Sequence, residues 1–235
     1  LCPLAPTGTH AQEPEAASLE EVVVTARKRE ESVNSTPVAI TAFSGADLAK
    51  LGMSDVLELQ KATPGFHNES LISSPGRFDS APTFRGVTTN TIDPTRQTAS
   101  IFVDGVYVAG GRPQVVPSAI ERVEIIRGPQ AALFGRSTFG GAINYIQRRP
   151  RAVPSGEVNL LAATESEQRI DATLEGPLFS PALTGRLSGA YHRKGAQFTS
   201  ALDGADLGEE RDTVLSASLY FTPGESFRSI VSATW

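Results

Sequence analysis

The sequence is poor in the residues that support metal binding, disulfide bonds or membrane-spanning helices. Its one cysteine, Cys2, allows neither a disulfide within the chain nor a cysteine-based zinc site. The three histidines, His10, His67 and His192, are far apart and do not form a metal-binding pair. Since no run of about 18 apolar residues occurs, we expect no transmembrane helix. We therefore expect neither a metal nor a cofactor.

Charge and motif content argue against nucleic-acid binding and against catalysis. The net charge is −5 and the acidic and basic residues are interspersed, which is unlike the basic patch of a nucleic-acid-binding protein. The stretch GRSTF at 135–139 has Phe139 where a serine nucleophile elbow has its second glycine. Residues 128–140 are rich in glycine but match neither the P-loop nor the dinucleotide fingerprint. We see no catalytic constellation and expect that the protein is not an enzyme.

The first 35 residues are predicted to lie outside the folded domains. Residues 1–11 end in THA, a pattern that signal peptidase prefers, so we interpret them as the remnant of a signal peptide. The alternative is an arbitrary disordered N-terminus. Residues 12–35 predict a flexible polar tail, interrupted by Val22–Val24, which favour an extended backbone. No second apolar run lies within hairpin distance, so these valines form a lone strand that needs a partner.

Residues 36–150 predict a small mixed α/β domain. Ser44 is an N-cap with Asp47 at N3, which predicts a helix over 45–51 that ends at Gly52. Asp104-Gly105 between two β-rich runs predicts a hairpin with a type I′ turn. The other predicted elements are strands at 37–43, 100–103, 106–108, 120–126 and 142–147, a helix at 55–62 capped by Ser54, a helical turn at 130–134, and loop-like sequence at 66–82.

Residues 151–235 predict antiparallel strands of a transmembrane β-barrel. Apolar and polar side chains alternate in segments of about ten residues, which are 156–164, 168–176, 183–193, 213–222 and 226–235. A soluble β-sandwich shows the same period. Three features favour the membrane: the segments are long enough to span at a tilt, aromatic residues lie near their ends, and the connection 194–211 is long whereas 222–226 is short.

Five blocks of sequence, in this order, resemble the plug domain of TonB-dependent outer-membrane receptors: EEVVVTA at 20–26, FRGV at 84–87, IFVDGVYV at 101–108, IERVEIIRGPQAALFG at 120–135 and GGAINYIQRRP at 140–150. The resemblance covers residues 20–150. It implies a small α+β plug domain at 36–150, followed at 151–235 by the first strands, about five, of an antiparallel transmembrane β-barrel of about 22 strands.

The resemblance implies energised uptake of a large, scarce solute across the outer membrane of a Gram-negative bacterium. In this family the ligand, most commonly an iron–siderophore complex, binds from outside. TonB, driven by its inner-membrane energising complex, captures the valine-rich box from the periplasm by strand addition. Outer-membrane lipid surrounds the barrel. Cobalamin, haem and glycans use the same architecture, and the sequence does not choose among them. The alternative class is a soluble periplasmic binding or adaptor module without transport.

The resemblance also implies three groups of site residues. The proposed TonB-binding residues are Glu21, Val22, Val23, Val24, Thr25 and Ala26. Arg85 and Arg127 match the plug arginines that pair with glutamates of the barrel wall, which would lie beyond residue 235, and Glu121 and Glu124 are expected in the same network. The alternative is two arginines in exposed turns. The candidate ligand contacts, on loops at about 66–82 and 88–98, are Arg77, Asp79, Thr89, Asn90 and Arg96.

Overall fold

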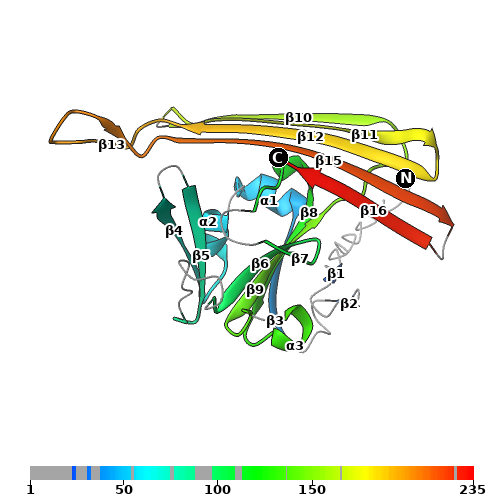
Figure 1. The fold of residues 1–235 in the computed structure, drawn as a ribbon, viewed down its shortest axis with the longest axis horizontal. Coiled ribbons are helices and arrows are strands. Elements are labelled where there is room, and N and C mark those ends of the chain that lie inside the picture. The colour runs from blue at the N-terminus through cyan, green and yellow to red at the C-terminus, as the bar shows by residue number, and fades with distance from the viewer. Residues whose placement is uncertain are drawn as a thin grey trace, which may run out of the picture.

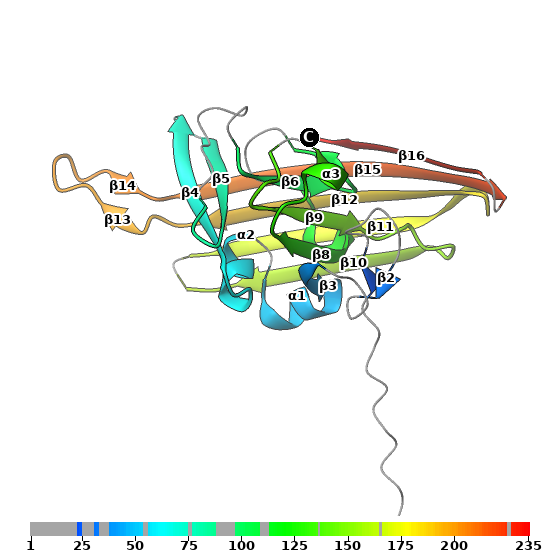
Figure 2. The same cartoon turned by 90° about the horizontal axis from the view of Figure 1, so that it is seen from below.

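The chain forms an N-terminal α/β domain and a C-terminal antiparallel sheet that lie against each other (Figures 1 and 2). The structure is a computed structural model. It describes residues 23–24, 31–32, 38–53, 56–74, 77–87, 97–108, 113–135, 137–164, 166–224 and 227–235. The predicted change of character after residue 150 therefore appears as a change of architecture.

The N-terminal domain is built on a five-stranded sheet of order β3-β8-β9-β6-β7. Only β6 and β9 run parallel, and the other neighbours are antiparallel. The elements are β3 (Ala39–Ser44), α1 (Gly45–Leu51), α2 (Val56–Leu59), the 3₁₀ helix η2 (Gln60–Ala62), β4 (Phe66–Ser74), β5 (Arg77–Phe84), β6 (Ala99–Val103), β7 (Val106–Tyr107), the 3₁₀ helix η4 (Pro117–Ala119), β8 (Ile120–Arg127), α3 (Ala131–Phe134) and β9 (Gly141–Gln147).

The capping signals placed the first helix correctly. The Asp47 amide donates to Ser44 Oγ at 3.1 Å, and the Ser44 amide donates to Asp47 Oδ2 at 3.1 Å, which completes a capping box. Gly52, with φ of 66°, ends the helix. The second predicted helix begins in the described chain at Val56 and continues as η2 to Ala62. Its predicted cap, Ser54, lies outside the described residues.

The Asp104-Gly105 turn has φ of 50° and 78° at its two central residues, as a type I′ turn requires. The side chain of Asp104 accepts a hydrogen bond from the Gln147 amide at 2.8 Å, and the Gly105 amide donates to Asn144 Oδ1 at 3.1 Å. Two of the sequence blocks that carry the family resemblance are thus hydrogen-bonded to each other.

The prediction of a loop at 66–82 is wrong, because β4 and β5 form an antiparallel hairpin there. The apolar residues that could signal it, Phe66 and Phe84, stand at its base, where their ring centroids are 5.2 Å apart and both side chains are buried. Beyond that base the hairpin has its own backbone ladder and a largely polar sequence. Its strands therefore lack the periodic apolar face on which the sequence argument depends.

The core of the N-terminal domain packs between its sheet and the elements α1, α2 and β4–β5. Its buried apolar side chains are Phe43, Leu48, Leu59, Phe66, Phe84, Ala99, Ile101, Ile120, Val123, Ile125, Ile143 and Tyr145. Gly141 allows Phe84 to enter this core: a Cβ there would lie 2.8 Å from Phe84 Cδ2 and 2.6 Å from the Ile126 carbonyl oxygen. The FRGV and GGAIN blocks meet at this contact.

The C-terminal sheet confirms the five predicted strands, in the antiparallel order β10-β11-β12-β15-β16. They are β10 (Ser155–Ala162), β11 (Gln168–Ser180), β12 (Leu183–Lys194), β15 (Glu210–Gly224) and β16 (Phe227–Thr234). The long connection after β12 carries a small hairpin, β13 (Phe198–Thr199) with β14 (Asp206–Leu207), which the sequence analysis did not predict. No helix among the described residues has the length and apolar character needed to cross a membrane.

Candidate functional site

The two faces of the C-terminal sheet have the polarity opposite to that of a soluble β-sandwich. Its outward face carries leucines that are about half to two-thirds exposed, such as Leu174 at 65%, Leu187 at 58% and Leu215 at 53%. Its other face, which is covered by the N-terminal domain, buries Glu175 and Arg186. A soluble sandwich would bury the apolar face instead, so the arrangement is that of a membrane barrel strand.

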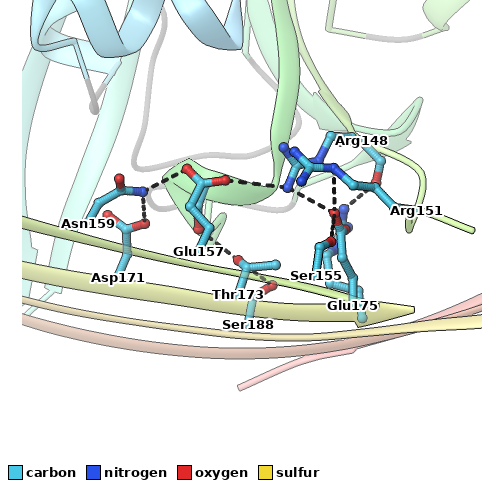
Figure 3. Close-up of polar contacts among 11 residues, drawn as sticks. Arg148, Arg151, Ser155, Glu157, Asn159, Asp171, Thr173, Glu175 and Ser188 are labelled. Carbon is cyan, nitrogen blue, oxygen red and sulfur yellow. Dashed lines mark hydrogen bonds and ion pairs between the residues drawn. The ribbon is translucent and has the colours of Figure 1, made fainter. Parts of the chain in front are cut away.

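A row of hydroxyl groups joins the N-terminal domain to this sheet. The hydroxyl oxygen of Ser118 in η4 lies 2.7 Å from that of Thr173 in β11. The Thr173 hydroxyl donates to Ser188 of β12 at 3.0 Å (Figure 3). Register continues the row, because Ser188 is paired with Ser216 and Ser216 with Thr234. Ser118, Thr173 and Ser188 are buried, so their hydrogen bonds replace those to water.

A charged cluster lies two residues further along the same face of the strands. Glu175 Oε1 lies 3.3 Å from Arg148 Nη2 and 3.2 Å from Arg151 Nε, and Ser155 Oγ donates to the same carboxylate at 3.4 Å (Figure 3). Arg148 also faces Glu157 at 3.8 Å. The side chain of Glu175 is 2% exposed, whereas those of Arg148 and Arg151 are 26% and 51% exposed. The cluster therefore neutralises a buried carboxylate with two arginines of the segment that follows β9.

Arg186 of β12 makes the reciprocal contact from the sheet. Its guanidinium donates to Gln147 Oε1 at 2.6 Å and to the carbonyl oxygen of Arg148. The backbone amide of Gln147 in turn donates a hydrogen bond to Asp104 Oδ1. Loss of hydration raises the pKa of Asp104, while the hydrogen bond from Gln147 and the charge of Arg186 act in the opposite direction.

Comparison with known proteins was consistent with the expected family. The model of the TonB-dependent receptor plug domain matches residues 32–142. The chain is 31% identical over 172 residues to an iron-regulated outer membrane virulence protein of Vibrio cholerae, covering 68% of this chain and 26% of that protein. It is 28% identical over 170 residues to the ferrioxamine B receptor of Salmonella typhimurium, covering 70% and 23%.

A solved structure has the same fold. The crystal structure of the ferric yersiniabactin uptake receptor of Yersinia pestis superposes with a TM-score of 0.73 and 24% identity, over 84% of this chain and 31% of that one. The N-terminal domain is a plug domain of the TonB-dependent receptors. This is an outer-membrane family of Gram-negative bacteria. The chain spans between about a quarter and a third of the length of the curated relatives it matches.

Of the two plug arginines expected to meet the barrel wall, Arg127 makes hydrogen bonds within the plug domain itself, whereas Arg85 is exposed. Arg127 donates to the Pro64 carbonyl oxygen at 2.9 Å and to Thr41 Oγ1 at 3.3 Å. Strand β8 starts at the C-terminal sheet, directly after η4, and ends on the side where α3 lies, away from that sheet (Figure 1). Arg85 is exposed in a turn at φ of 50°. Their pairing with wall glutamates stays a prediction, because the expected partners lie beyond residue 235.

The two plug glutamates lie on β8 beside Arg122. Glu124 is fully buried and lies 2.8 Å from Arg122 Nε, and Glu121 contacts Arg122 Nη1. This pairing within one strand balances the charge of a carboxylate that has no access to water. Their role in contacts with the wall also stays a prediction.

The candidate ligand contacts divide between the described and the undescribed chain. Arg77 and Asp79 belong to β5, and Thr89, Asn90 and Arg96 lie outside the described residues. The β4–β5 hairpin and the β13–β14 hairpin lie toward the same end of the C-terminal sheet, opposite the end at which β15 stops and β16 begins (Figures 1 and 2).

The valine stretch has a partner that the sequence analysis did not foresee. Strand β1 (Val23–Val24) pairs with β2 (Glu31–Ser32), and Val24 is buried. The sequence of β2, Glu31-Ser32, is polar and is therefore not a second apolar run, but backbone pairing does not require apolar side chains. The other predicted TonB-binding residues, Glu21, Val22, Thr25 and Ala26, lie outside the described residues.

The residues that join the plug domain to the C-terminal sheet were missed altogether. They are Ser118, Gln147, Arg148, Arg151, Thr173, Glu175, Arg186 and Ser188. A signal was present: the basic run at 148–151 directly precedes strands whose alternate positions carry carboxylates, and a polar face inside a barrel needs polar partners.

Proposed function

We propose that this chain is the plug domain and the first barrel strands of a TonB-dependent receptor that imports an iron–siderophore complex. The observation that carries the transport role is the inverted C-terminal sheet, with leucines outward and charged residues buried against the plug domain. An apolar outward face suits outer-membrane lipid as its neighbour. A soluble periplasmic module would expose these leucines to water.

Energy coupling is proposed to act through residues 21–26. A two-residue hairpin such as β1–β2 offers few backbone hydrogen bonds of its own, so a longer partner strand can replace β2 at little cost. TonB would add its strand edge to the valine stretch and pull from the periplasm. The flanking basic residues 27–29 keep this apolar stretch soluble until capture.

Ligand capture is proposed at the end of the molecule where the β4–β5 and β13–β14 hairpins lie. That end carries the long connection 195–209, and barrels of this kind place long connections outside the cell. An iron–siderophore ligand is supported by the names of two relatives and one solved neighbour, which are an iron-regulated protein, a ferrioxamine B receptor and a ferric yersiniabactin receptor.

The test uses the full-length receptor in a strain that lacks its own siderophore receptors. Uptake of radioiron is measured with ferrioxamine B, ferric yersiniabactin and ferripyoverdine, and uptake of cobalamin serves as the non-iron comparison. Iron uptake from at least one siderophore, lost when TonB is deleted, is the expected result. Uptake of cobalamin alone would contradict the proposed ligand class but not the transport role.

The coupling step is tested separately by Val23→Pro, which removes a backbone donor from β1. Uptake should fall to the level of the TonB-deleted strain, while surface expression and siderophore binding stay normal. The matched control is Lys28→Pro, in the basic spacer, which should transport normally. Normal uptake by the Val23 variant would refute the assignment of residues 21–26 as the TonB-binding segment.

A further inference from the structure

We propose that the contact of η4 and residues 147–151 with β11 and β12 is a standing anchor that stays closed while solute passes the plug domain. The passage would then open on the side of the plug domain that faces away from β11 and β12. This proposal rests on the transport function proposed above, and it concerns which contacts within the receptor persist. The residues involved position the plug domain and need not touch the solute.

The two plug segments of the anchor form one body. The Arg148 amide donates to the Ala119 carbonyl oxygen at 2.8 Å, and Ile120 is paired with Gln147 in the β8–β9 ladder. The hydroxyl contact of Ser118 and the charged contact of Arg148 therefore cannot separate from the sheet independently. Opening either contact requires both to open together, and this raises the barrier to detachment.

The residues of β11 and β12 at the anchor complement the charged and polar groups of the plug segment. Glu175 faces two arginines of the plug segment (Figure 3). The guanidinium of Arg186 donates to the side chain of Gln147 and to the backbone carbonyl of Arg148. Withdrawing the plug segment would break these ion pairs and hydrogen bonds together, and both charged side chains would then have to be hydrated or paired anew. Contacts that must all break in one step oppose detachment more strongly than any one of them alone.

The covalent chain also holds this end of the plug domain at the C-terminal sheet. Only residues 149–154 separate Arg148 from the start of β10, so this end of the plug domain is covalently held beside the wall. The other end of the plug domain is held less firmly. Strand β3 is an edge strand that pairs within its sheet with β8, and it follows the proposed TonB-binding residues 21–26 in sequence. A pull on residues 21–26 therefore reaches β3 before it reaches the anchor.

The experiment locks the anchor with a disulfide and measures uptake. Ser118→Cys with Thr173→Cys, in a Cys2→Ser background, replaces two hydroxyl oxygens that are 2.7 Å apart, close enough for sulfur atoms at these positions to bond after a small adjustment. The full-length receptor is assayed with radioiron-loaded ferrioxamine B and ferric yersiniabactin, oxidised and after dithiothreitol. We expect uptake rates within twofold of each other. Loss of uptake on oxidation, restored by dithiothreitol, would overturn the anchor.

A second lock separates failure of the anchor from failure of the proposed function. Val23→Cys with Ser32→Cys places a disulfide between paired residues of β1 and β2, and it should prevent TonB from binding residues 21–26. Oxidation of this pair should abolish uptake reversibly. If it does not, capture of the valine stretch is wrong, and the anchor is still judged by the first lock.

A labelling experiment judges the anchor even if neither siderophore is transported. Thr173→Cys alone, at a position that is 2% exposed, should be equally protected from a maleimide in cells with and without TonB. Labelling that increases only when TonB is present would overturn the anchor. Equal protection in the two strains is the result that the anchor requires.

Discussion

The anchor makes a quantitative prediction for Glu175→Gln. The glutamine keeps the shape of the side chain and can still accept a hydrogen bond from Ser155, but it removes the charge that faces Arg148 and Arg151. Removing one partner of a fully buried ion pair costs about 3–5 kcal/mol, and an exposed pair is worth about 0–1 kcal/mol. Because the two arginines are 26% and 51% exposed, we expect an intermediate cost of about 2 kcal/mol.

Glu209 provides a matched control within the same chain. It also lies beside two arginines, 3.3 Å from Arg193 Nε and 3.3 Å from Arg211 Nη2. The side chains of this trio are 44%, 49% and 59% exposed, so water screens the attraction. Glu209→Gln should therefore cost less than about 0.5 kcal/mol, although Glu209, like Glu175, faces two arginines.

The assay is urea unfolding of the plug domain inside the full-length receptor. A fluorophore on Lys50→Cys, in a Cys2→Ser background, reports on α1 and not on the barrel. With a dependence of about 1–3 kcal/mol per molar urea, a loss of about 2 kcal/mol lowers the midpoint by roughly 1 M. Equal midpoints for the Glu175 and Glu209 variants would refute the reasoning, because Glu175 is buried against the plug segment whereas Glu209 is exposed and pairs with arginines of β12 and β15.

Three further predictions follow from other parts of the structure. Gly141→Ala should destabilise the plug domain by about 1–3 kcal/mol, measured by the same urea transition, because its Cβ has no room beside Phe84. Leu187→Arg on the outward face should reduce folding into lipid bilayers by about 2–4 kcal/mol if the residue lies near the bilayer midplane, measured by equilibrium folding of the full-length receptor. The raised pKa of Asp104 means that its contribution to stability is present at low pH and is lost as pH rises through the raised pKa. Asp104→Asn keeps an acceptor for the Gln147 amide, so its urea midpoint should vary less with pH than that of the wild type.

The sequence predicted the structure correctly where the structure depends on a short local pattern of residues. The capping box of Ser44 and Asp47 located α1, and Asp104-Gly105 fixed the type I′ turn, since both depend on residues within one turn of the backbone. The five strands of the C-terminal sheet were also found, because their period of two persists over about ten residues. The order of the blocks from 84–87 to 140–150 identified the family.

Sequence reasoning failed where the partner of a strand is polar. The β4–β5 hairpin is stabilised by its own ladder and by Phe66 and Phe84 at its base, so its strands carry no apolar period. Strand β2 has the polar sequence Glu31-Ser32 and pairs with the valine stretch, so a search for apolar partners cannot detect it. The backbone hydrogen bond does not depend on side-chain type, so these pairings leave only a faint trace in the sequence.

The polar face of the C-terminal strands held more information than the sequence analysis extracted. Glu175 and Arg186 stand directly opposite each other on β11 and β12, on a face that a membrane barrel turns inward. Charged side chains on such a face must find partners inside, and the nearest basic run in the sequence, at 148–151, enters the sheet at the same end. The anchor is therefore a consequence of strand polarity together with chain connectivity, and the same reasoning predicts where other barrel-forming chains hold a domain inside.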